Sequence, residues 1–207
     1  MTGRFITLEG GEGVGKSTQL QVLAEALRAR GLTVVTTREP GGSAGAEAIR
    51  ALLMTGSEDR WSARAEALLF AAARADHVEK LIRPALARGD WVLCDRFIDS
   101  TRAYQGGAGG LSDDDILALH GVGSQGLMPD RTLVLTLPAR DANARTLERD
   151  GGKPDRFGAK NSTYHQKVAA AFDVMAAQEP VRIKLVSGEG AAQAATARLL
   201  TALADLL

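Results

Sequence analysis

Short apolar runs alternate with longer stretches of helical periodicity along the whole chain. The runs are rich in β-branched and aliphatic residues, which is typical of buried strands. Five strands are therefore predicted, at Arg4 to Glu9, Leu32 to Thr37, Trp91 to Asp95, Arg131 to Leu137 and Val181 to Val186. Strands that alternate with helices in this way predict an α/β fold in which a five-stranded parallel sheet is wrapped by helices.

The segments between the runs predict the helices. One helix is expected at Thr18 to Arg30 and a long one at Trp61 to Arg88. Pro84 falls within the long stretch, so that helix is expected either to kink or to end with Arg83 as the boundary. The alanine- and leucine-rich stretch from Gly190 to Leu207 is expected to pack against the sheet.

The ends of the predicted strands carry charged residues. Glu9, Arg38 and Asp95 each end or directly follow a strand. Binding sites on parallel sheets lie at the carboxyl ends of the strands, so these side chains and the residues just beyond them are expected to converge on one crevice.

Length, charge and cysteine content narrow the class of protein. The 207 residues suit one domain, at 1–207, and the 25 acidic and 25 basic residues cancel, which favours neither nucleic acid nor a membrane surface as a partner. No apolar run approaches membrane-spanning length and no signal peptide is recognisable. The single cysteine, Cys94, is expected to be a small buried residue, and a cytoplasmic location is predicted.

The glycine-rich stretch after the first strand fits G-x-x-x-x-G-K-[ST], the phosphate-binding loop. Glycines allow such a loop to turn its N–H groups around an anion, and the following helix adds its positive end. A glycine-rich turn that binds nothing is the alternative, but strand, helix and Lys-Ser pair rarely coincide by chance. Lys16 is expected to reach the outer phosphates, and the Ser17 hydroxyl is expected to bind Mg²⁺ directly. The candidate phosphate ligands are Gly10, Gly11, Glu12, Gly13, Val14, Gly15, Lys16, Ser17 and Thr18.

The third strand ends in a carboxylate, Asp95, a pattern typical of a second phosphate-site strand that positions Mg²⁺ and its waters. Hydroxyl, aromatic and amide side chains follow it and could bind a polar small molecule. The glycines at 106–110 are expected to form a flexible turn. The polar residues after the strand are Arg96, Ser100, Thr101, Tyr104 and Gln105.

Glu66, Phe70 and Arg74 recur at i+4 spacing on the long helix, so they share one face. The ring could stack on a nucleobase and the guanidinium could donate to it, although such a trio more often packs a helix on its neighbour. The loop at 38–42, Arg-Glu-Pro-Gly-Gly, is open to two interpretations, an ordinary turn or part of the site.

The segment from Arg140 to Phe157 is unusually rich in charge, with Gly151 and Gly152 near its middle. A glycine-hinged basic segment fits a lid, about 145–160, that closes over phosphates. A solvated surface helix followed by a loop is the alternative.

Taken together, these motifs resemble the bacterial thymidylate kinases, P-loop kinases of nucleoside monophosphates. The matches are the phosphate loop, the Arg-Glu-Pro-Gly-Gly loop, Phe70-x-x-x-Arg74, and the run from Asp95 to Gln105, which is the most specific. The resemblance spans nearly the whole chain. It implies the nucleoside monophosphate kinase fold with a short lid, transfer of the γ-phosphoryl of ATP to dTMP in dTTP biosynthesis, Mg²⁺ as cofactor, and a homodimer.

The resemblance also implies individual roles. Lys16 and Arg96 act at the transferring and acceptor phosphates, with Arg38 close by, and Ser17 and Asp95 serve the metal, Asp95 through water. Glu12 lies near the sugar hydroxyl, and Tyr104 crowds the 2′ position. The ring of Phe70 stacks on thymine, Arg74 donates to a base carbonyl, and Thr101 lies near the ring edge. The implied dTMP ligands are Glu12, Arg38, Phe70, Arg74, Arg96, Ser100, Thr101, Tyr104 and Gln105.

An arginine that points at the transferring phosphoryl group stabilises its charge, but the variable loop positions, 11–14, contain no arginine. The chain is similar to the branch of the family in which the lid supplies it. Arg149 and Arg156 are the catalytic candidates, and Arg145 is expected to lie against adenine. The chain departs from the family at Thr136, at 158–160 and at 187–188.

Three other classes remain as alternatives. A regulatory GTPase would need an N-K-x-D guanine-binding motif, which the sequence lacks. A kinase for a different nucleotide fits the loop alone, but the run from Asp95 to Gln105 argues against it. A nucleotide-binding switch would bind ATP without turnover that depends on a monophosphate.

Overall fold

The computed structural model describes residues 3–57, 59–138, 140–142, 145 and 156–207. Within them, five strands form one parallel sheet in the order β2-β3-β1-β4-β5. All five predicted strands are confirmed, and each boundary falls within two residues of its expected place. The strands are β1 (Arg4–Glu9), β2 (Val34–Arg38), β3 (Trp91–Asp95), β4 (Arg131–Thr136) and β5 (Ile183–Ser187).

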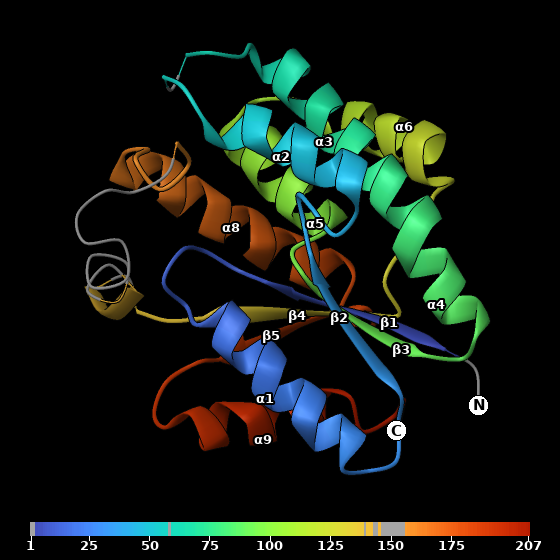
Figure 1. Cartoon of the computed structure of the whole chain (residues 1–207). Helices are drawn as coiled ribbons and strands as arrows, with labels where there is room; N and C mark the ends of the chain where they lie inside the picture. The colour runs from blue at the N-terminus through green and yellow to red at the C-terminus, as the bar shows by residue number, and fades with distance from the viewer. Residues whose placement is uncertain (1–2, 58, 139, 143–144, 146–155) are drawn as a thin grey trace.

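Helices cover both faces of the sheet. Helices α1 and α9 lie together on one face, whereas the larger group, with α3, α5 and α8, lies on the other (Figure 1). Within the described part of the chain, none of the helices combines the length and hydrophobicity that crossing a bilayer requires. The α-helices are α1 (Lys16–Arg28), α2 (Ala44–Met54), α3 (Ala63–His77), α4 (Arg83–Ala87), α5 (Ile98–Thr101), α6 (Asp113–Ser124), α8 (Ser162–Gln178) and α9 (Ala192–Ala202), and η1 (Val78–Ile82) and η2 (Arg102–Ala108) are π-helical.

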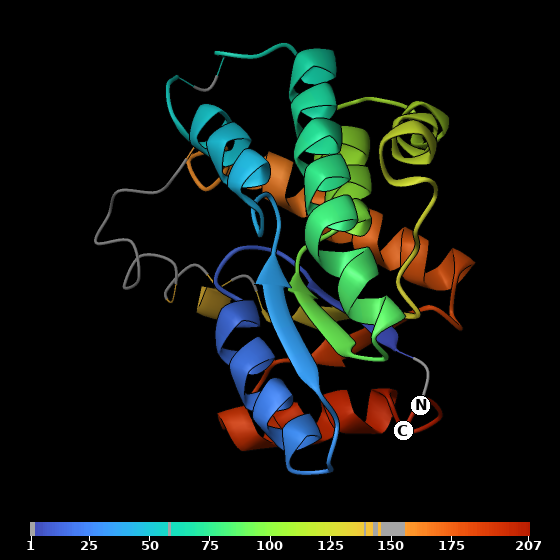
Figure 2. The same cartoon turned by 45° about the vertical axis from the view of Figure 1, so that its right-hand side comes forward.

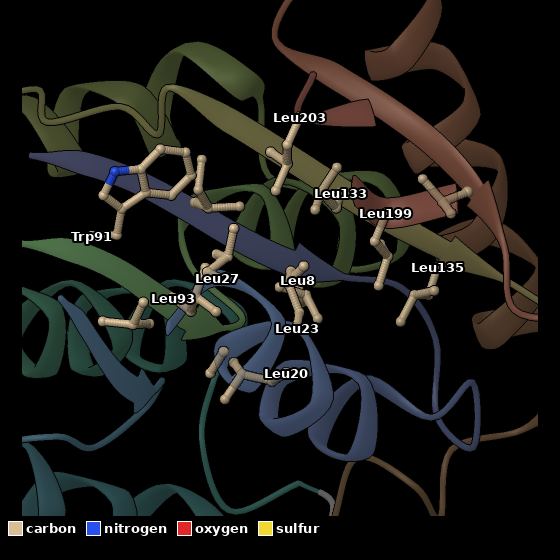
Figure 3. Close-up of a cluster of buried hydrophobic side chains, with 14 of the residues drawn as sticks. Leu8, Leu20, Leu23, Leu27, Trp91, Leu93, Leu133, Leu135, Leu199 and Leu203 are labelled. Atoms are coloured by element: carbon tan, nitrogen blue, oxygen red, sulfur yellow. The ribbon is translucent and has the colours of Figure 1, made fainter. Parts of the chain in front are cut away.

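Alternate residues of β1 enter the two layers beside the sheet. Ile6 and Leu8 belong to the core beneath α1 and α9, where Leu23 and Leu199 are fully buried (Figure 3). Phe5 belongs to the opposite core, with residues of η1, α4 and α6. The expectation that the C-terminal stretch packs against the sheet is therefore confirmed.

The predicted long helix is divided into three consecutive segments, α3, η1 and α4, which Figure 2 shows as one continuous run of helix. Its hydrogen bonding changes to the π pattern at η1, where the N–H of Arg83 donates to the carbonyl of Val78, and α4 begins at the expected boundary, Arg83. A wider turn of this kind accommodates a residue that has no N–H to donate.

The predicted flexible turn at 106–110 is wrong in its first part. Gly106 and Gly107 belong to η2, which packs along α8. A Cβ on Gly107 would stand 2.5 Å from the Cβ of Ala171, so the glycine allows the two helices to approach closely.

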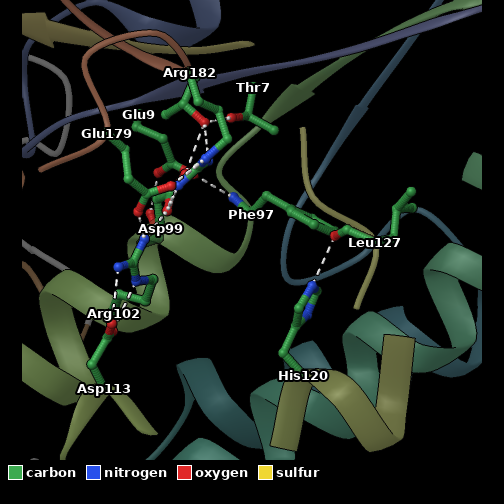
Figure 4. Close-up of polar contacts among 12 residues, drawn as sticks. Thr7, Glu9, Phe97, Asp99, Arg102, Asp113, His120, Leu127, Glu179 and Arg182 are labelled. Carbon is green, nitrogen blue, oxygen red and sulfur yellow. Dashed lines mark hydrogen bonds and ion pairs between the residues drawn. The ribbon is translucent and has the colours of Figure 1, made fainter. Parts of the chain in front are cut away.

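A polar network anchors α5 and η2 to the rest of the fold. Asp99 is completely buried and accepts hydrogen bonds from Arg182, Arg102 and Thr132 (Figure 4). Glu179, at the end of α8, accepts from the same two arginines. Because α5 and η2 follow β3 directly, this network fixes the segment that carries the predicted polar residues.

Candidate functional site

The phosphate loop joins β1 to α1 in the expected conformation. Gly10, Gly13 and Gly15 have φ of 126°, 71° and 91°, values that residues with a Cβ rarely adopt. A Cβ on Gly10 would also stand 2.4 Å from the carbonyl oxygen of Leu135. Helix α1 begins at Lys16 with no side-chain cap, so its first N–H groups are available to an anion.

Lys16, Ser17 and Asp95 meet at the mouth of this loop. The Lys16 ammonium group donates to the carbonyl oxygens of Gly10 and Gly11 at 3.3 and 2.6 Å, and burial lowers the pKa of Lys16 to about 8. The Ser17 hydroxyl donates to Oδ2 of Asp95 at 2.7 Å. The cation and the oxygen ligands that the sequence predicts are therefore adjacent.

The Ser17 and Asp95 pair fits a magnesium ion. Both supply oxygen, and Mg²⁺ typically takes one or two protein oxygens and completes its shell with phosphates and water. Among the described residues there is no group of three or more His, Cys, Asp or Glu side chains that could hold a metal. A metal that draws most of its ligands from a nucleotide suits this arrangement better than one held in a protein cage.

Arg96 follows Asp95 in a left-handed backbone conformation, with φ of 70°. Its guanidinium donates to Glu12 at 2.5 Å and to Ser100 at 3.1 Å, and it lies 4.9 Å above the ring of Tyr104. The nearby carboxylates and the Tyr104 oxygen outweigh burial and raise the pKa of Arg96. A fixed cation therefore faces the crevice beside the phosphate loop.

A second group of side chains lies farther from the loop. Arg74 is buried, and its guanidinium donates to Glu39 at 2.7 Å and to the Thr101 hydroxyl at 2.8 Å. Phe70 lies one helical turn away, with its ring centroid 5.7 Å from that of Phe157. An aromatic face and a guanidinium held in place together could bind a flat, polar ring.

One pocket of about 800 Å³ joins these groups. It has room for a nucleotide, because pockets of ~300–1,000 Å³ hold drug-sized ligands. Arg38 also lines it, although its side chain is exposed and pairs with Glu47 at 3.2 Å. The expected site residues among its lining are Glu12, Gly13, Val14, Gly15, Lys16, Ser17, Thr18, Arg38, Phe70, Arg74, Asp95, Arg96, Ser100, Thr101, Tyr104, Gln105 and Arg145.

The two expected lid arginines, Arg149 and Arg156, and the expected adenine-side arginine, Arg145, have different places. A guanidinium nitrogen of Arg145 lies 3.7 Å from where a Cβ on Gly15 would stand, and Arg145 also lines a smaller hollow with Leu137 and Glu189. Arg149 lies outside the described residues. Arg156 is buried away from the phosphate loop, where it donates to the carbonyl of Leu53 and forms an ion pair with Glu66 at 2.5 Å. Its catalytic role stays a prediction, because this conformation does not bring it to the phosphates.

Three carboxylates orient the site although the sequence indicated no individual role for them; Glu9 was expected at the crevice, but it is not among the described residues that line the pocket. Glu39 accepts from Arg74 and contacts His77 at 3.1 Å, and Glu66 accepts from Gln105 at 2.9 Å. Glu9 is buried, which with the charge of Asp99 raises its pKa to about 8. Their positions in the sequence indicated that they could belong to the site, since Glu9 ends a strand, Glu39 follows Arg38, and Glu66 shares a helix face with Phe70. The sequence does not reveal which side chain each carboxylate would contact.

Comparisons with known proteins agree on one family. The family model described as thymidylate kinase matches residues 8–198. A thymidylate kinase of Rhizorhabdus wittichii is 62% identical over 207 residues, which cover 100% of both chains. One of Bradyrhizobium sp. is 50% identical over 193 residues, covering 93% of this chain and 85% of the relative. The crystal structure of thymidylate kinase from Ehrlichia chaffeensis has a TM-score of 0.78 at 30% identity and covers 98% of this chain and 100% of its own.

Proposed function

The chain belongs to the thymidylate kinase family and phosphorylates dTMP with ATP to give dTDP, and from this premise we propose how the pocket performs the transfer. The observation that supports the proposal most strongly is the shape of the pocket. One cavity runs from the phosphate loop past Arg96 to Phe70 and Arg74, so a donor phosphate and an acceptor nucleotide can meet within it.

The donor phosphates lie in the loop. The N–H groups of the loop and of the first turn of α1 bind their oxygens, and Lys16 turns from the carbonyls of Gly10 and Gly11 to the outer phosphates. Ser17 would hold Mg²⁺ directly and Asp95 would hold it through water, and the ion would supply positive charge against the negative charge that develops during transfer.

The acceptor dTMP lies on the other side of Arg96. The fork of Arg96 binds its phosphate, Phe70 stacks on thymine, and Arg74 donates to a carbonyl of the base. The hydrogen bond from Arg74 to Glu39 leaves the guanidinium fixed, so orientation is set before the base arrives. The remaining acceptor ligands are Glu12, Arg38, Ser100, Thr101, Tyr104 and Gln105, as the sequence predicts.

Charge on the transferring phosphoryl group is stabilised by a lid arginine, Arg149 or Arg156. Arg156 would first have to leave Glu66 and the end of α2. Arg145 lies by the phosphate loop, which supports its proposed place against adenine.

Several broader features belong to the same proposal. The chain acts as one kinase domain at 1–207 with a lid at about 145–160, as a homodimer, in the cytoplasm and in dTTP biosynthesis. Its balanced charge supports partners limited to ATP, dTMP and a second copy of itself, without nucleic acid or membrane.

A coupled assay of ADP release against dTMP, dUMP, dCMP and AMP tests the proposal. We expect dTMP to be preferred over dUMP by about tenfold or more, because the thymine methyl against Phe70 contributes roughly 1–3 kcal/mol. We expect dCMP to be poorer still, since an amino group would face the Arg74 donor. Equal specificity constants for dTMP and dUMP would contradict the proposed base pocket.

A further inference from the structure

Glu9 ends the central strand at the edge where the pocket lies, yet it is not part of the pocket wall. It is completely buried, and the described residues that line the pocket do not include it. A carboxyl group in such a place must have its oxygens satisfied by the protein.

Both oxygens of Glu9 bind the segment that carries Arg96. Oε1 accepts the N–H of Phe97 at 2.7 Å, and Oε2 accepts the Ser100 hydroxyl at 2.5 Å. Figure 4 shows the bond from the Phe97 nitrogen to Glu9, beside the Asp99 network. The Ser100 oxygen in turn accepts from the guanidinium of Arg96 at 3.1 Å. One carboxyl group therefore holds Arg96 both through the next backbone N–H and through its side chain.

Arg96 needs such support. Its left-handed φ of 70° is unfavourable for a residue with a Cβ and persists only where surrounding bonds hold it. The N–H of Arg96 donates to Leu8 at 3.0 Å, and the N–H of Phe97 donates to Glu9. The end of β1 thus accepts hydrogen bonds from two consecutive N–H groups, those of Arg96 and Phe97. These bonds fix the backbone at Arg96, whose side chain lines the pocket.

We propose that Glu9 is a positioning residue for the acceptor phosphate, because it holds the left-handed turn at Arg96 and orients that guanidinium through Ser100. This inference rests on the role proposed above for Arg96. Glu9 itself does not contact dTMP.

Steady-state kinetics of Glu9→Ala and Glu9→Gln test the inference. Alanine removes both acceptors, and we expect the KM for dTMP to rise about tenfold or more while the KM for ATP stays unchanged, since misplacing a binding group by ~1 Å costs up to ~100-fold. Glutamine retains an oxygen for Phe97 and supplies an N–H to the Ser100 oxygen, so it should restore most of the affinity. An unchanged KM for dTMP in Glu9→Ala would overturn the inference, as would equal impairment by the two variants.

A matched control is available at the opposite end of β3. Asp90 is also buried and accepts from Arg88 at 3.0 Å, far along the strand from Asp95. Asp90→Ala should leave the KM for dTMP unchanged. If it raises that KM as much as Glu9→Ala does, loss of any buried carboxylate has the same effect and Glu9 has no special role.

The coupling between Glu9 and Arg96 separates this inference from the proposed function. If Glu9 acts through Arg96, Glu9→Ala should add little to the KM for dTMP in an Arg96→Lys background, whereas full additivity would overturn it. Turnover of dTMP by the unaltered protein tests the proposed function first and independently. Should Glu9→Ala not fold, as judged by circular dichroism, Glu9→Asp keeps a carboxyl group but shortens the side chain by one methylene, so it no longer reaches Phe97 and Ser100 together. It should raise the KM for dTMP, and an unchanged value would overturn the inference.

Discussion

Replacing Asp99 by alanine should destabilise the folded protein strongly. Its carboxylate accepts from Arg182 at 2.7 and 2.9 Å, from Arg102 at 3.1 Å and from Thr132 at 2.8 Å, without exposure to solvent. Removing one partner of a buried ion pair typically costs about 3–5 kcal/mol, because the remaining charge is left uncompensated. Glu179 still accepts from both arginines, so we expect the lower end, about 3 kcal/mol.

Urea unfolding followed by circular dichroism measures this loss, and a thermal scan should show a Tm lower by about 6–12 °C, at ~2–4 °C per kcal/mol for a chain of this size. Asp113 offers a control, since it also accepts from Arg102, at 2.8 Å, but its side chain is half exposed. Asp113→Ala should cost no more than about 1 kcal/mol. Equal losses in the two variants, or a loss below about 1 kcal/mol for Asp99→Ala, would refute the reasoning.

The pH dependence of the same pair of proteins gives a second check. Burial alone would raise the pKa of Asp99, but the hydrogen bonds and charge of Arg182 outweigh it and hold that pKa below its ordinary 3.8. A carboxyl group with a lowered folded pKa stabilises the protein above its unfolded pKa and loses that contribution as the pH falls through the folded pKa. The stability difference between the unaltered protein and Asp99→Ala should therefore be constant near neutral pH and shrink only well into the acid range.

Three further predictions concern catalysis. Arg96→Lys should raise the KM for dTMP strongly and leave ATP binding nearly unchanged, because lysine cannot form the bidentate fork; unaltered dTMP kinetics in the folded variant would remove Arg96 from the site. Arg149→Ala or Arg156→Ala should lower kcat far more than it weakens dTMP binding, and near-normal kcat in both single variants and the double variant would exclude a lid arginine. Chelation of divalent metal with EDTA should abolish turnover and added Mg²⁺ should restore it, whereas turnover that persists in EDTA would contradict the assignment of Ser17 and Asp95.

The fold was predictable from sequence because each strand is a compact apolar run between charged or glycine-rich boundaries. The local sequence pattern did not determine the backbone conformation at single residues such as Pro84 and Gly107. Pro84 was expected to kink or end a helix at Arg83, and α4 does begin at Arg83, but the π-helical segment that precedes it was not indicated by the sequence. Gly107 indicated a turn, but the glycine serves a helix contact with Ala171, which depends on a partner 64 residues away in the sequence.

The site was predictable where a motif joins neighbouring residues, as in the loop that ends at Ser17. The site was less predictable where a long side chain can reach several partners, because only the packed structure determines which one it contacts. Nothing local to Arg156 indicates that its guanidinium ends at Leu53 and Glu66. Likewise, the short bond between Arg74 and Glu39 joins a helix to a loop, and only the packed structure determines it.

The position of β1 at the centre of the sheet divides the pocket into two halves of separate origin. The proposed acceptor ligands beyond Glu12 come from the end of β2 and the segments after β2 and β3, on one side of β1, whereas Arg145 and the glycines at 188 and 190 follow β4 and β5 on the other. With the ligands assigned as proposed, substitutions at residues 38–105 would alter which monophosphate is accepted without touching Arg145 or the glycines at 188 and 190. The sheet order would then keep the two substrate preferences on separate segments, with β1 and the phosphate loop as their shared boundary.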